Sequence, residues 1–179
     1  MLLGCAGTVA PKPKPLIFST LPNDWGSDID LEQTKCKPIA GVFENLGIRQ
    51  NDNGFRTDDG LLSRNVLARS LSSSEIAESL VIYSDTESNF LRAELRGQFT
   101  ITIEIEVSCR SGWHVFTFER SGAYLGDGVV EKRFFHSAWF RQDRDDNLVA
   151  RVLRNAEYEI QFRETTSESS EEWYFFQPL

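Results

Sequence analysis

The clearest pattern of hydrophobic and polar positions in this chain covers residues 98–107. From Phe99 to Val107 every second residue is apolar, and threonines and glutamates lie between them. This period of two predicts a β-strand of about 30 Å with odd-numbered side chains facing the interior and even-numbered ones facing water. The β-branched residues also favour a strand over a helix. A strand of this length requires long partner strands on both sides.

Similar alternation on both sides of this segment predicts a β-meander with short turns. The expected strands cover residues 39–45, 79–84, 91–95, 113–120, 134–141, 148–153, 158–162 and 173–176. Residues 51–60 are rich in Asn, Asp and Gly, which predicts a loop. Asp58 or Asp59 at its end would cap a short helix over residues 61–70.

These elements predict an all-β fold over residues 36–179. Consecutive antiparallel strands with one dry face must bury that face and protect the sheet edges. A mostly antiparallel up-and-down meander that closes into a barrel of about 8–9 strands achieves both. A two-sheet sandwich is the alternative architecture.

Residues 1–35 differ from the rest in composition. Lysine and proline alternate between Ala10 and Pro15, and no hydrophobic period is present, which predicts an extended tether. One apolar cluster interrupts this tether and leaves open a second arrangement, in which this part packs on the domain. The cluster comprises Leu16, Ile17, Phe18, Leu21 and Trp25.

The segment Leu2-Leu3-Gly4-Cys5 resembles the lipobox of bacterial lipoproteins. The resemblance implies cleavage before Cys5, a diacylglycerol on its thiol and, because Ala6 follows, export to the periplasmic side of the outer membrane. A secretory signal requires a longer apolar region than four residues, so this interpretation places the translation start upstream. The alternative is a chance match at an ordinary cysteine.

The charge of the chain excludes some partners. It has 179 residues with a formal net charge of −8, and it is 40% hydrophobic. Nucleic-acid binding requires a basic surface, and electrostatic docking on anionic lipid does so too, so neither is expected. No run of apolar residues is long enough for a transmembrane helix. The expected contact with a membrane is therefore the lipid anchor at Cys5.

Three cysteines are present, at positions 5, 36 and 109. If Cys5 is lipidated, Cys36 and Cys109 remain, and two cysteines left over in an oxidising compartment often form a disulfide. Two separate thiols are the alternative.

The sequence contains no catalytic or metal-binding constellation that we recognise. His114 and His136 lie in aromatic strands without zinc-ligand spacing, which favours structural roles. No nucleophile elbow is present, and the glycines of residues 122–128 lack the helix and lysine of a phosphate loop. Nothing selects a glycosidase pair among the 27 acidic residues. We therefore expect no enzymatic activity, metal or cofactor.

Aromatic residues are concentrated in the later strands. Most of them are expected in the core, but a barrel of this size can keep a cavity at its mouth. The candidate ligand-lining residues are Trp113, Phe116, Phe135 and Trp139.

Several loose motifs together resemble an uncharacterised group of bacterial envelope lipoproteins with a lipocalin- or calycin-like barrel. They cover residues 36–176: Cys36-x-x-Ile39-x-Gly41-x-Phe43-x-Asn45-x-Gly47, Leu61 to Arg64, Cys109-x-x-Gly112-Trp113, Asn147 to Arg151, and Trp173-Tyr174. The group brings no assigned activity. The resemblance implies an envelope address and a barrel.

Two hypotheses of function follow. In the first, a non-enzymatic envelope lipoprotein binds a small apolar ligand or lipid inside the barrel. In the second, the barrel is filled, and the protein has a structural role or binds a protein or cell-wall partner on its surface. An open or a packed interior distinguishes them.

Overall fold

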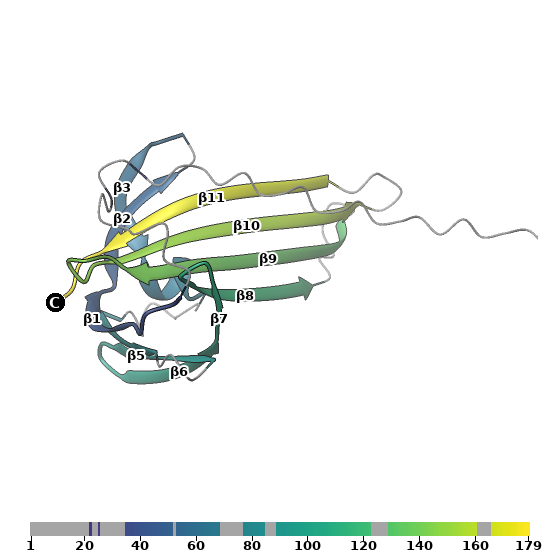
Figure 1. Ribbon diagram of the computed structural model, residues 1–179. Helices are drawn as coiled ribbons and strands as arrows, with labels where there is room; N and C mark the ends of the chain where they lie inside the picture. Colours follow the sequence, from purple (N-terminus) through teal and green to yellow (C-terminus); the bar gives the residue numbers. More distant parts are fainter. Residues whose placement is uncertain are drawn as a thin grey trace, which may run out of the picture.

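The computed structural model describes residues 35–51, 53–68, 77–84, 89–122, 129–160 and 166–179, together with Pro22 and Trp25. These residues form two antiparallel sheets and one helical turn (Figure 1). The smaller sheet has the strand order β1 (Ala40–Glu44), β4 (Ser79–Ser84), β5 (Phe90–Arg96), β6 (Thr100–Glu106). The larger has the order β3 (Arg56–Leu61), β2 (Leu46–Asn51), β11 (Thr166–Phe176), β10 (Leu148–Ile160), β9 (Val129–Gln142), β8 (Trp113–Gly122), β7 (Ser108–Arg110). The all-β prediction is confirmed.

The two sheets enclose a shared hydrophobic core. Alternating residues of β4, β5 and β6 meet even-numbered residues of β9, β10 and β11, among them Phe140, Ala150 and Phe176. Figure 1 shows that β8 to β11 extend beyond the smaller sheet, so it covers only part of the larger one. The face of the larger sheet that is turned away from this core is called the outer face below.

The alternating segment forms β6, and its predicted orientation is largely confirmed. Ile105 is buried, Ile101 and Ile103 pack partly buried against the core, and the even-numbered residues are exposed. Phe99 is an exception, because it lies in the turn before the strand and is 63% exposed. The expectation of long partners on both sides is wrong. β6 lies at the edge of the smaller sheet and pairs with β5.

Neither sheet closes on itself, so the predicted closed barrel is not confirmed. The chain passes from one sheet to the other three times instead. It does so from β3 to β4, and at two tight bends: β1 is followed after Asn45 by β2, and β6 is followed after Val107 by β7. Each bend moves the chain to the other sheet after a few residues, so these strands do not add to one continuous ladder.

The short helix predicted over residues 61–70 is confirmed in part, as a single turn, and residues 69 and 70 lie outside the described residues. The predicted cap by Asp58 or Asp59 is wrong. Both aspartates lie in β3, within the predicted loop, and the described part contains only a single turn of π-helix, η1 (Leu62–Val66). The cap comes from Asn45, at the bend between β1 and β2. Its backbone carbonyl accepts from the Leu62 N–H at 2.8 Å, and its side-chain Oδ1 accepts from the Ser63 N–H at 2.9 Å. A residue distant in the sequence, through its backbone carbonyl and its side chain, therefore satisfies the N–H groups that a local aspartate was expected to take.

Candidate binding groove on the outer face of the larger sheet

The strand register places three cross-strand rows of side chains next to one another on the outer face. The first contains Val115, Trp139, Arg151 and Trp173; the second contains Thr117, Ser137, Leu153 and Glu171; the third contains Glu119, Phe135, Asn155 and Ser169. The second row begins with two small hydroxyl side chains, and the rows on both sides carry a large aromatic residue. Because strand neighbours two apart share a face, this large–small–large order leaves a hollow over Ser137.

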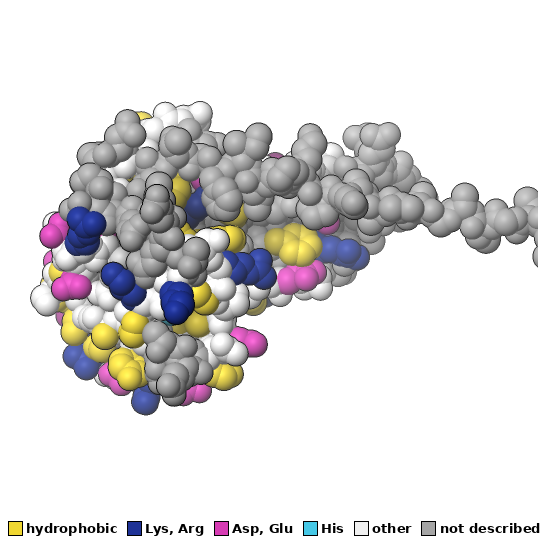
Figure 2. Space-filling view, viewed as in Figure 1, with side chains coloured by type: hydrophobic (Ala, Val, Ile, Leu, Met, Phe, Trp, Pro, Cys, Tyr) yellow, Lys and Arg dark blue, Asp and Glu magenta, His cyan; other side chains and the backbone are white. Residues whose placement is uncertain are grey.

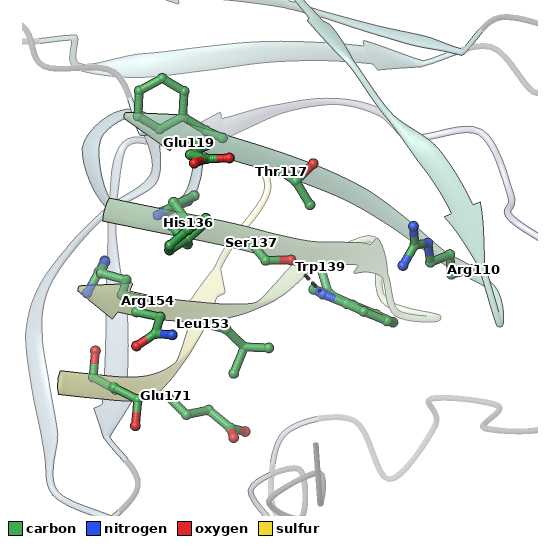
Figure 3. A pocket seen from close by; sticks show the side chains of 14 residues that line it. Arg110, Thr117, Glu119, His136, Ser137, Trp139, Leu153, Arg154 and Glu171 are labelled. Atoms are coloured by element: carbon green, nitrogen blue, oxygen red, sulfur yellow. Dashed lines mark hydrogen bonds between the residues drawn. The ribbon is translucent and has the colours of Figure 1, made fainter. Parts of the chain in front are cut away.

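A groove encloses about 940 Å³ at this hollow (Figure 3). Its apolar lining includes Phe135, Trp139 and Leu153, and its polar lining includes Ser137 and Thr117. This volume lies in the range of small-molecule sites, which typically combine apolar surface with a few polar groups.

The indole of Trp139 is held in place by a local hydrogen bond. Its Nε1–H donates to the Ser137 Oγ at 3.0 Å, and both side chains are half-buried (Figure 3). This hydrogen bond fixes the orientation of the ring beside Ser137. Trp139 therefore forms one wall of the groove.

Charged side chains of both signs line the groove. Arg110 from β7 and Glu119 from β8 are exposed. Glu171 binds Arg151 through two hydrogen bonds of 2.7 and 2.9 Å, and the Arg151 guanidinium also lies over the Trp173 ring. Such a bidentate pair fixes the carboxylate. The groove is thus lined by positively and negatively charged side chains.

An aromatic cluster continues the outer face beyond the groove. Trp25, Val149 and Trp173 are buried there, with Ile48, Trp113 and Phe175 packed against them. Trp25 is 4% exposed, its ring centroid lies 5.7 Å from that of Phe175, and the Arg56 guanidinium lies over it. Trp25, which belongs to the predicted tether, therefore packs on the domain. The other residues of the apolar cluster in the tether, and Cys5, lie outside the described residues.

Directly behind the groove, the inner face carries a polar cluster. Arg154 binds Glu172, and its Nη2 donates to the Tyr174 hydroxyl at 3.0 Å, which itself donates to the Glu172 Oε2 at 2.6 Å. Burial raises the pKa of Tyr174, and the hydrogen bond to Glu172 adds to this, so the phenol stays protonated. Arg49 adds a second cation, 3.5 Å from Glu172. These contacts join β2, β10 and β11.

Both histidines are buried and bind backbone carbonyls. The Nε2 of His136 lies 2.9 Å from the Val66 oxygen at the end of η1, and the Nε2 of His114 lies 2.7 Å from the Lys37 oxygen. Burial lowers the pKa of His136, and the positive charge of Arg154 lowers it further, against the opposing effect of the carbonyl. These contacts fit structural roles.

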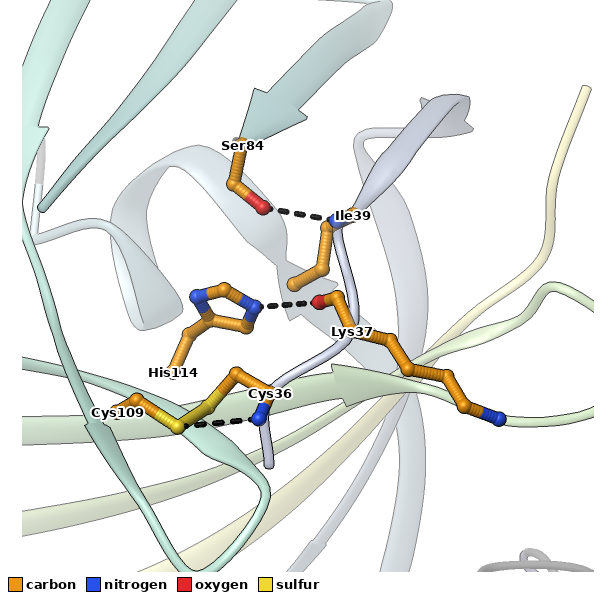
Figure 4. Close-up of a disulfide and its surroundings, with 6 residues drawn as sticks. All are labelled: Cys36, Lys37, Ile39, Ser84, Cys109 and His114. Carbon is orange, nitrogen blue, oxygen red and sulfur yellow. Dashed lines mark hydrogen bonds between the residues drawn. A yellow bond between two sulfur atoms is a disulfide. The ribbon is translucent and has the colours of Figure 1, made fainter. Parts of the chain in front are cut away.

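Cys36 and Cys109 are joined by a disulfide with a Cα–Cα distance of 5.8 Å (Figure 4). The bond ties the segment before β1 to β7. Next to it, His114 binds Lys37, and the Ser84 hydroxyl accepts from the Ile39 N–H at 2.8 Å. The N-terminal end of the domain is thus attached by one covalent bond and by hydrogen bonds.

The structure does not bring the four predicted ligand-lining residues together. Phe135 and Trp139 line the groove. Trp113 lies on the same face but packs edge-on against Trp173, and Phe116 lies on the other face against the core. Ser137 was not among the predicted residues, although the alternation of Phe135, Ser137 and Trp139 along one strand face is visible in the sequence.

In the described part of the chain, no helix is long and apolar enough to cross a membrane. Within the same residues, no three His, Cys, Asp or Glu side chains are grouped so that they could hold a metal ion. Comparisons with protein-family models, with curated proteins and with solved structures found no match for this chain.

Proposed function

We propose that this chain is a non-enzymatic binding protein of the bacterial envelope, which holds its ligand in the outer-face groove. The observation that carries the proposal is the hollow over Ser137 between Trp139 and Phe135. It combines aromatic walls with neutral polar groups, as small-molecule sites do. No described group in it is arranged as a nucleophile with its base.

The ligand binds on the surface and not between the sheets. Side chains from both sheets pack into one cluster of buried apolar residues, including Leu80, Leu95 and Phe140. This packing favours the second sequence hypothesis, a filled interior with a surface partner. The calycin-like resemblance stays part of the proposal and rests on the sequence motifs alone.

The proposed cellular location rests on the lipobox resemblance. A diacylglycerol at Cys5 would anchor the protein to the periplasmic side of the outer membrane, and the disulfide fits an oxidising compartment. The test is to express the gene with its natural upstream sequence and to fractionate the cells. Cys5→Ala should move the protein from the membrane to the soluble fraction. Unchanged membrane retention would contradict the anchor.

The groove is tested with N-phenyl-1-naphthylamine, a neutral dye that fluoresces in apolar sites. The full-length chain should bind it. Ser137→Trp fills the hollow and should weaken binding by about tenfold or more, which corresponds to about 1.4 kcal/mol. Thr117→Phe provides a second filling variant on the neighbouring strand.

Thr102→Trp is the matched control, because it adds a large ring at an exposed position of β6 in the smaller sheet. It should bind the dye like the wild type. Urea melts of each variant check that the fold is intact. If both filled variants bind the dye as the wild type does, the groove is not the site, and the proposal is wrong.

A further inference from the structure

We infer that the groove takes a neutral oligosaccharide, with a sugar ring stacked on Trp139. This inference rests on the proposed function, since it names the ligand class of the same site. Three properties of the groove lead to it: the spacing of its aromatic walls, the neutral polar groups between them, and its balance of charge.

The walls are spaced for a chain of rings. Trp139 and Phe135 lie on the same face of β9, four residues apart, which is a separation of roughly 13 Å along an extended strand. A single sugar ring does not bridge this distance, whereas a short oligosaccharide does. Aromatic faces carry negative charge density, and the C–H groups on one side of a pyranose ring are weakly positive, so the two surfaces attract.

Neutral hydrogen-bonding groups lie between and beside these walls. Ser137, Thr117, Asn155 and Ser169 line the groove, and their side chains can both donate and accept. An acyl chain would cover these groups without binding them, at a cost of about 1–3 kcal/mol for each group left unsatisfied. Sugar hydroxyls also donate and accept, so they match this lining.

The charges of the lining disfavour an ionic ligand. Exposed Arg110 is offset by exposed Glu119, and Glu171 is bound to Arg151. The guanidinium of Arg154 is bound to Glu172 on the inner face. Figure 2 shows basic and acidic side chains interspersed on the face in view. With a net charge of −8, the chain also disfavours a stacked nucleic acid.

The position of the groove disfavours an extended peptide. Strand addition needs a free sheet edge, where backbone groups can pair. In the described residues β7 pairs only with Trp113 to Val115 of β8, and β2 pairs only with Glu172 to Phe175 of β11, so both strands have an open edge beside the groove. The groove itself lies on the faces of the strands, and its central strands β9 and β10 are paired on both sides. A β-strand peptide would find no ladder there.

The test is isothermal titration calorimetry of the full-length chain with cellotriose, maltotriose and N,N′,N″-triacetylchitotriose. We expect at least one of them to bind with a dissociation constant in the micromolar to millimolar range. Trp139→Phe keeps a ring face and should stay within about threefold of the wild type. Trp139→Leu keeps apolar surface without a ring and should weaken sugar binding by about tenfold, while binding of the naphthylamine dye persists.

Phe99→Leu is the matched control, because it removes an exposed aromatic ring outside the groove and should leave sugar binding unchanged. If none of the three sugars binds while the dye does, the saccharide inference is overturned and the proposed function stands. If neither dye nor sugar binds, both are wrong. Equal weakening by the two Trp139 variants would refute ring stacking.

Discussion

The disulfide between Cys36 and Cys109 allows a quantitative prediction of stability. It links residues 73 positions apart. In the chain-entropy description, closing a loop of this length lowers the entropy of the unfolded chain enough to stabilise the fold by about 4 kcal/mol. The double variant Cys36→Ala, Cys109→Ala removes this constraint and should lose about that amount.

The surroundings of the bond make this loss interpretable. Cys109 is exposed and Cys36 is half-buried, so replacing both thiols with methyl groups leaves no large cavity. The contacts of Lys37 with His114 and of Ile39 with Ser84 still hold the segment on the domain. The folded state should therefore change little, and the effect should arise mainly in the unfolded ensemble.

Urea melts analysed by linear extrapolation measure the effect. With a slope of about 2 kcal/mol per molar urea, the midpoint of the variant should fall by about 2 M. Wild type treated with a phosphine reductant should melt like the variant, and the variant itself should not respond to the reductant. A loss below about 1 kcal/mol would refute the entropic reasoning. Two alkylatable thiols in the exported protein would refute the bond itself.

Three further predictions concern the core and the buried polar groups. Ile105→Asp places a charge in the core and should lower the free energy of unfolding by several kcal/mol. Thr102→Asp places the same charge in water and should change it by no more than about 0.5 kcal/mol. Equal losses in urea melts would contradict the orientation of β6. The pKa of His136 lies below its ordinary 6.5 in the fold, so the unfolded chain takes up the proton first, and stability should fall as the pH drops from 7 to 5. Melts at both pH values should show a smaller fall in His136→Gln; an equal fall would exclude this histidine as the cause. Tyr174→Phe removes the hydroxyl that lies between the Arg154 guanidinium and the Glu172 carboxylate and should lower the free energy of unfolding by about 1–3 kcal/mol. Tyr158→Phe removes a hydroxyl that forms an exposed hydrogen bond and should change it little. Equal losses in urea melts would contradict a structural role of the inner-face polar cluster.

The period-two pattern of the sequence was sufficient to locate a strand where one face of the strand is buried and the other is exposed to water. The segments that became β5 and β6 could be located closely, because their apolar residues alternate with polar ones. The segment that became β4 was located by its short apolar run between polar residues. The pattern failed for β3, which contains Thr57, Asp58 and Asp59 and almost no apolar residue. The pattern also predicted two separate strands where β10 is continuous, and it predicted only the last residues of β11. Both strands extend beyond the smaller sheet, where no second sheet requires apolar side chains.

The candidate site was predictable only in part. Aromatic composition pointed to Phe135 and Trp139, but it pointed equally to Phe116 and Trp113. Only the register of four neighbouring strands shows that Ser137 faces Thr117 and Leu153 between the two rings. Nothing in the local sequence of β9 indicates which side chains its neighbours will present.

The sequence by itself thus determined the all-β class, the dry side of the regular strands and the pair of cysteines that could be joined. The tertiary structure decided that the chain bends at Asn45 and Val107 to form two sheets, and that Asn45 caps a turn many residues away. It also decided that Trp25 covers Phe175, at the opposite end of the sequence. The physical reason is that periodicity records only whether a side chain is buried, whereas strand pairing and packing depend on contacts between distant segments.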